Sequence, residues 1–240
     1  VILELAEPRV RAGVWEHTRF REAPRERIQR TGLAAMVTVY GARSVAQALI
    51  TRVNRMHARV RGTTPEGEPY AADDPELLTW VHATAAFGFV EAYSAYVAPL
   101  SRAERDRFYA EGREAAQLYG AVNAPTSQVE MDVLFDVTLP RLAPSPVVFE
   151  FLNVVRAAPI LPPLARGLQA PMIKAAVSIT PAVVRRTLGL GSQWTANALD
   201  RALVRFAARA ADQIVLDASP AALACRRLGL PADWLWRRRP

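Results

Sequence analysis

Apolar residues recur along the chain mostly at intervals of three and four positions, and runs of β-branched residues are short. This spacing places apolar side chains on one face of an α-helix, whereas a half-buried strand needs strict alternation. The pattern therefore predicts an all-α chain of about eight to ten helices. The expected helices span residues 25–40, 44–61, 75–96, 101–120, 126–139, 147–157, 163–179, 181–188, 193–215 and 219–228.

Capping residues mark several of these boundaries. Gly62 follows a periodic segment, as glycine often does after the last residue of a helix. Asp74 followed by Pro75 is a strong helix start, and Ser101-Arg-Ala-Glu104 is a capping box. Residues 62–73 are rich in Gly, Pro and Thr, so we expect a loop between two helices there.

Two of the three histidines lie on apolar helical stripes, so we expect both imidazoles to point into the protein. An inward histidine is most often a hydrogen-bonded core residue, and this interpretation stays open for each of them. The first stripe contains His57 with Val45, Leu49, Val53, Met56 and Val60, and the second contains His82 with Leu78, Val81, Ala85 and Phe89.

The length and composition fit a single domain. The chain has 240 residues and is 51% hydrophobic, which is enough to bury one sizeable core. Its first residue is Val1 rather than Met, so we expect that a segment precedes it in the full protein.

Charge and cysteine content narrow the choice of partners. The net charge of +7 is carried almost entirely by arginine, because Lys174 is the only lysine. The arginines are interspersed with carboxylates and no nucleic-acid-binding motif collects them, so we expect no nucleic-acid partner. The single cysteine, Cys225, excludes an internal disulfide and a cysteine-based metal site. These features fit a cytoplasmic protein.

No apolar run reaches the roughly 20 residues that a membrane-spanning helix needs. The closest stretch, from Pro146 to Ile179, is interrupted by charged residues and by four internal prolines, which predict short helices joined at corners. A pair of helices lying on a membrane surface is an open alternative, because it would suit an enzyme that takes an apolar substrate from lipid.

The apolar stripe around His57 offers the residue types that a haem site requires. An axial ligand needs a neutral imidazole nitrogen, and apolar side chains such as Val53 and Val60 would form walls for the macrocycle. The nearby Arg55 and Arg61 could reach haem propionates through their planar guanidiniums, and the alternative that both are solvent-facing helix charges stays open.

A non-haem Fe(II) site is the alternative metal chemistry. His57 and His82 with Asp73 or Asp74 supply two imidazoles and a carboxylate, which is the ligand set of such sites. No two histidines stand three or four residues apart, however, so a single helix turn cannot carry both.

Four motifs follow one another between residues 13 and 83. The motifs are Gly13-Val-Trp-Glu-His17-Thr-Arg-Phe20, Arg27-Ile-Gln-Arg30-Thr31, Met56-His57-Ala-Arg-Val-Arg61-Gly62 and Tyr70-Ala-Ala-Asp-Asp74-Pro75-Glu-Leu-Leu-Thr-Trp80-Val-His82-Ala83. Together they resemble the catalytic domain of the MpaB and rubber oxygenase family, which includes latex-clearing proteins and the fungal mycophenolic-acid oxygenase. The resemblance extends over nearly the whole chain.

This resemblance implies a single globin-like helical domain over residues 1–240 that holds haem b. It also implies that the enzyme uses O2 to cleave a carbon–carbon double bond in an apolar, isoprenoid-like substrate. His57 is then the axial iron ligand, and Arg61, His82 and His17 are the further cofactor-binding candidates.

The second motif corresponds to the distal side of the haem. Latex-clearing proteins have an Arg-x-x-Lys-Thr segment there, and Arg27-x-x-Arg30-Thr31 is similar. Arg30 stands where the family has a lysine, and arginine stays protonated, so it is a poor iron ligand. We therefore expect Arg27, Arg30 and Thr31 to act catalytically as hydrogen-bond donors to oxygen.

Three alternatives stay open at this point. His82 rather than His57 could bind the iron. The chain could instead be a non-enzymatic helical protein that carries or senses haem or lipid, or a metal-free interaction module with a basic surface. The family's acid-base glutamate has no counterpart in these motifs, since Glu16 and Glu22 lie nearby without matching it.

Overall fold

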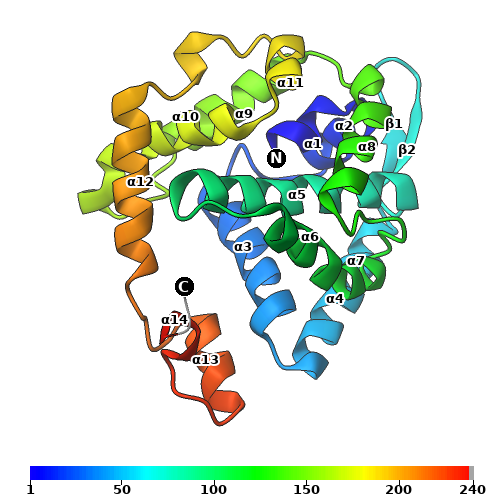
Figure 1. Cartoon of the computed structure of the whole chain (residues 1–240). Coiled ribbons are helices and arrows are strands. Elements are labelled where there is room, and N and C mark those ends of the chain that lie inside the picture. Colours follow the sequence, from blue (N-terminus) through cyan, green and yellow to red (C-terminus); the bar gives the residue numbers. More distant parts are fainter. Residues whose placement is uncertain (238–240) are drawn as a thin grey trace.

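The computed structural model describes residues 1–237 and confirms an all-α fold with one short two-stranded sheet (Figure 1). The helices are shorter and more numerous than expected, because several periodic segments divide into two. The first half contains α1 (Ile2–Ala6), α2 (Pro8–Glu16), α3 (Pro24–Tyr40), α4 (Arg43–His57), β1 (Arg61–Thr63), β2 (Pro69–Ala71), α5 (Pro75–Tyr96), α6 (Arg102–Glu111) and α7 (Arg113–Leu118).

The second half is built from helices joined by 3-10 turns. The expected helix over 163–179 divides into η2 and α10, and the one over 193–215 divides into η3 and α12. The elements are α8 (Gln128–Thr138), η1 (Leu139–Arg141), α9 (Pro146–Ala157), η2 (Pro163–Leu168), α10 (Gln169–Ile179), α11 (Ala182–Thr187), η3 (Ser192–Trp194), α12 (Ala198–Asp212), α13 (Pro220–Arg227) and α14 (Trp234–Arg237).

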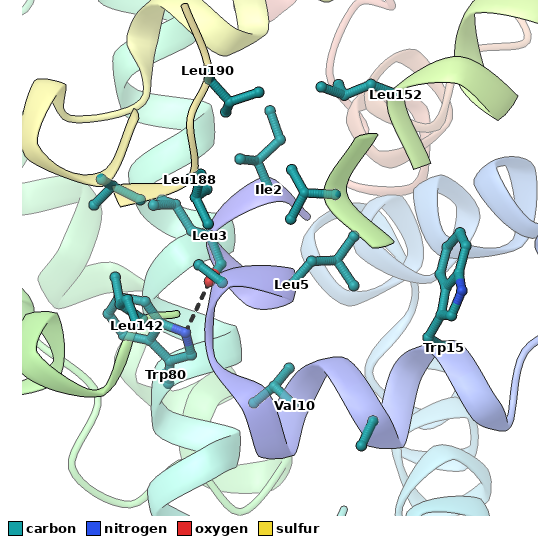
Figure 2. Close-up of a cluster of buried hydrophobic side chains, with 14 of the residues drawn as sticks. Ile2, Leu3, Leu5, Val10, Trp15, Trp80, Leu142, Leu152, Leu188 and Leu190 are labelled. Atoms are coloured by element: carbon teal, nitrogen blue, oxygen red, sulfur yellow. Dashed lines mark hydrogen bonds between the residues drawn. The ribbon is translucent and has the colours of Figure 1, made fainter. Parts of the chain in front are cut away.

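The N-terminal helices form the centre of the hydrophobic core. α5 crosses the middle of the molecule, and α1 packs between it and α9, while α2 packs against α1, α5 and the hairpin (Figure 1). Figure 2 shows Leu3, Leu5 and Trp15 among the buried side chains, with the indole Nε1 of Trp80 donating to the Leu3 carbonyl at 3.2 Å. This core fixes α5 and the end of α2, from which the chain continues to the candidate site.

The expected helix starts are confirmed. Asp74 caps α5 by accepting a hydrogen bond from the Glu76 amide at 2.8 Å, with Pro75 as the first helical residue. The Ser101 capping box opens α6 as predicted. The expected helix over 101–120 is divided, however, because α6 ends at Glu111 and α7 begins after Gly112.

The segment after α4 differs most from expectation. The predicted helix over 44–61 ends at His57, and the predicted loop over 62–73 contains an antiparallel hairpin. In this hairpin Arg61 pairs with Ala71, and Gly62 pairs with Tyr70. Arg61 therefore lies on a strand rather than on the helix of His57, which corrects the predicted spacing of these two residues.

The predicted apolar stripes are wrong in part. On α4, Met56 is 53% exposed and the unpredicted Ile50 is buried. On α5, Phe89 is 55% exposed, while the buried face carries Leu77, Trp80 and Val90. α5 is apolar on all sides, so its pattern does not select one face.

Within residues 1–237, no helix combines the length and the apolarity that crossing a bilayer would take.

Candidate functional site

His57 is the last residue of α4, and its imidazole is partly buried, as expected. The same face of the helix carries Val53 one turn earlier and the buried Ile50 two turns earlier. The ring nitrogen Nδ1 is buried and has no hydrogen-bond partner among residues 1–237. A buried nitrogen without a partner is costly, so this position suits a group that supplies the missing interaction.

The surroundings of this imidazole favour its neutral form. Burial lowers the pKa of His57, the nearby Arg27 guanidinium lowers it further, and Asp73 acts in the opposite direction. A neutral imidazole is the form that can bind a metal ion. The structure therefore brings His57 into the electrostatic reach of Arg27, one of the residues that the sequence motifs singled out.

Backbone hydrogen bonds hold the chain directly after His57. The Val60 amide donates to the His57 carbonyl at 2.9 Å, and the Ala72 amide donates to the Val60 carbonyl at 2.9 Å. The hairpin thus closes against the end of α4. Arg61 of the hairpin forms an exposed ion pair with Asp73 at 2.9 Å. This is the same carboxylate that acts to raise the pKa of His57.

Arg27 and Thr31 lie one turn apart on α3 and hydrogen-bond to each other. The Arg27 guanidinium donates to Thr31 Oγ1, and its Nε donates to Thr18 Oγ1 at 3.3 Å. Thr31 Oγ1 in turn donates to the Arg27 carbonyl at 2.9 Å. Burial lowers the pKa of Arg27, and the charge of exposed Arg30 adds to this effect. Arg27 and Thr31 are therefore held together by hydrogen bonds; Arg27 is partly buried, whereas Thr31 and Arg30 are both exposed.

His17 is not buried with the other two histidines. It lies exposed after α2, and its Nε2 is 3.1 Å from Tyr70 Oη on β2. Tyr70 Oη also donates to Glu16 Oε2 at 3.0 Å. Burial and the hydrogen bond to Glu16 raise the pKa of Tyr70, so the hydroxyl keeps its proton.

Sequence reasoning missed the role of Tyr70. Its side chain lies directly over Gly62, since a Cβ added at Gly62 would be 2.5 Å from the tyrosine hydroxyl. The sequence offers only a weak signal for this hairpin: Gly67 lies in the turn with a positive φ of 90°, while β1 and β2 have three residues each and show no alternating pattern. Through Tyr70 the hairpin is tied to the end of α2.

His82 lies on α5 in a different environment. It is partly buried, and burial alone lowers its pKa. Its ring faces Gly112, where an added Cβ would be 3.7 Å from Nε2. Among the described residues, no charged group acts on the pKa of His82 in the way that Arg27 and Asp73 act on the pKa of His57.

The structure does not bring together the two histidines and the carboxylate that a non-haem Fe(II) site would need. Within residues 1–237, no group of three or more His, Cys, Asp or Glu side chains is placed to hold a metal ion. One open hollow of about 470 Å³ lies along α12, away from the predicted site residues, and it is lined by Ala202, Arg205, Phe206, Arg209 and Ala210.

Comparison with known proteins gives one match. Neither a curated protein nor a solved structure matches the chain, so the likeness to globins stays a prediction. Residues 1–213 match the family described as ER-bound oxygenase mpaB/B'/Rubber oxygenase, catalytic domain. The chain therefore belongs to this family of oxygenase catalytic domains.

Proposed function

We propose that this oxygenase domain depends on haem b, with His57 as the axial iron ligand, and acts with O2 on an apolar substrate. An isoprenoid is the first candidate, by resemblance to the family. The observation that carries this proposal is the neutral, partly buried imidazole of His57, whose Nδ1 has no partner among the described residues.

The donor set around His57 fits a haem. The imidazole is fixed at the end of a helix beside apolar Val53 and Ile50, which suits an axial ligand next to a macrocycle. Arg61 supplies a guanidinium of the kind that pairs with carboxylates such as propionates. His82 is the weaker ligand candidate, because Arg27 and the Arg61–Asp73 pair gather near His57 instead.

When bound, the haem would supply the iron chemistry that activates O2. In this proposal, the protein contributes hydrogen-bond donors whose side chains are already held in position. The Arg27 guanidinium stays protonated and is held by Thr18 and Thr31, so it can face developing negative charge on oxygen without first reorganising. Exposed Arg30 adds positive charge at longer range.

The reaction proposed is the oxidative cleavage of a carbon–carbon double bond. Both atoms of one O2 molecule enter the products, one at each new carbonyl end, so atoms and electrons balance without a further reductant. Tyr70, His17 and Glu16 hold the hairpin beside this site, and we assign them a positioning role.

The test measures O2 consumption by haem-loaded protein supplied with an isoprenoid, together with aldehyde or ketone ends in the products. Arg27→Gln should lower the rate about a hundredfold, as expected for a donor that stabilises charge on oxygen. Arg25→Gln, an exposed arginine on the same helix, is the matched control and should keep the wild-type rate.

Two outcomes would contradict the proposal. A pigmented protein that consumes no O2 with any isoprenoid would indicate a carrier or sensor of haem. An Arg27→Gln variant with the wild-type rate would remove the role proposed for the distal segment.

A further inference from the structure

The segment between α9 and α10 forms an apolar projection. It contains Pro159, Pro162 and Pro163 and appears yellow-green at the left edge of Figure 1. Leu164 in η2 is 104% exposed, more than any other large apolar side chain among residues 1–237. A single exposed leucine needs no explanation, but a fully exposed one on a proline-stiffened projection has a defined position in space.

The base of this projection is held by one side chain. Gln169 Nε2 donates to the carbonyls of Val155 at 2.8 Å, Arg156 at 3.1 Å and Ala158 at 2.7 Å. These carbonyls belong to the last turn of α9 and the residue after it, where helical partners are missing. Ala158 is also buried, so the projection starts from a fixed point.

Two arginines without acidic partners flank the same base. Arg156 and Arg166 line a hollow of about 260 Å³ together with Gln169. Neither forms an ion pair with a carboxylate among residues 1–237, whereas Glu150 on the same helix α9 is paired with Arg21 at 2.6 Å. The guanidiniums are thus free to bind an anion, and arginine matches the geometry of phosphate oxygens.

We propose that this projection docks on the surface of an anionic lipid bilayer, with Leu164 entering the apolar region and Arg156 and Arg166 binding lipid phosphates. A bilayer surface presents a phosphate layer above an apolar layer, and the projection presents a pair of cations behind an apolar tip. The chain's net charge of +7 favours approach to such a surface. This inference is independent of haem and of catalysis.

The experiment is co-sedimentation of the full chain with vesicles of phosphatidylcholine alone or mixed with phosphatidylserine. Wild-type protein should sediment with the mixed vesicles and much less with the neutral ones, and added salt should weaken binding. Leu164→Asp should reduce binding by about tenfold or more, because the leucine can no longer be buried. The double variant Arg156→Gln with Arg166→Gln should lower binding to the mixed vesicles nearly to the level for neutral ones.

Matched control variants carry the same changes elsewhere. Val137→Asp replaces a 63% exposed apolar residue on α8, on the opposite side of the molecule in Figure 1. Arg102→Gln with Arg107→Gln removes two exposed charges from α6. Both controls should bind as the wild type does, and circular dichroism checks that each variant is folded.

Three results would overturn the proposal. The first is the absence of wild-type binding to either kind of vesicle, and the second is unchanged binding of folded Leu164→Asp. The third is a dimer in size-exclusion chromatography that Leu164→Asp converts to a monomer, which would assign the projection to a second copy of the chain. None of these results depends on pigment or turnover, so the failure of this inference is separate from that of the proposed function.

Discussion

At the scale of single residues, Gly62 is required by the close approach of Tyr70. An alanine Cβ there would be 2.5 Å from the tyrosine hydroxyl, which is itself held by His17 and Glu16. Gly62→Ala should therefore lower the free energy of unfolding by about 1–3 kcal/mol, as overpacking does elsewhere. Urea unfolding measures this change.

The control is Gly88→Ala in α5, where an added Cβ meets no atom within 4 Å. This substitution should stabilise the protein by about 0.5–1 kcal/mol, because alanine favours the helix more than glycine does. If Gly62→Ala were as stable as the wild type, the described contact between Tyr70 and the hairpin would be wrong.

The buried imidazole of His57 predicts a pH dependence of stability. Its pKa is lowered in the folded protein from the usual 6.5, so below about pH 6.5 the unfolded chain binds the proton more readily. The stability that the neutral ring contributes is present above this pH and is lost as the pH falls toward the folded pKa. Haem-free wild type should thus lose more stability than His57→Gln between about pH 7 and about pH 5.

Urea unfolding at a series of pH values measures this difference directly. All other titratable groups are the same in the two proteins, so the comparison isolates the contribution of His57. The same decrease in the free energy of unfolding for wild type and His57→Gln would contradict the described environment of this ring.

At the scale of elements, local sequence signals predicted the helix starts well. Asp74 and the Ser101 capping box act through hydrogen bonds to residues two or three positions away. The local sequence is therefore sufficient to locate the starts of α5 and α6. The predicted inward position of His57 is also confirmed. That Arg27 and Asp73 act on the pKa of His57 follows only from the three-dimensional arrangement of α3 and the hairpin around the end of α4.

The hairpin and the buried face of α5 could not be predicted in the same way. β1 and β2 have three residues each, too few for an alternating pattern, and they are positioned by Tyr70 and by packing against α2. α5 is apolar on all sides, so its neighbours rather than its pattern decide that Trp80 is buried and Phe89 is exposed.

The cap of α5 gives a prediction at this scale. Asp74→Ala should lower the free energy of unfolding by about 1 kcal/mol, because the Glu76 amide loses its acceptor. Asp74→Asn should stay close to the wild type, since asparagine caps as well as aspartate does. Thermal or urea unfolding of both variants tests this, and equal losses for Ala and Asn would show that charge rather than capping matters.

At the scale of the whole molecule, the candidate site joins parts that are far apart in sequence. Arg27 comes from α3, His57 from α4 and Arg61 from the hairpin, while α1, α2 and α5 form the core that supports them. A cofactor that binds only this folded arrangement stabilises it. Haem at about a hundred times its Kd should add about 2.7 kcal/mol.

A thermal melt with and without hemin measures this gain. The melting temperature of wild type should rise with hemin, and that of Gly88→Ala should rise equally, because Gly88 is not one of the residues proposed to hold the haem. Equal melting temperatures for wild type with and without hemin would contradict the proposed dependence on haem.

The most direct test of the central claim is the ultraviolet–visible spectrum of the purified protein after hemin loading. We expect a Soret band in the wild type that is lost in His57→Ala and kept in His82→Ala. A Soret band that persists in folded His57→Ala and disappears in His82→Ala would assign the iron to His82 and contradict this account.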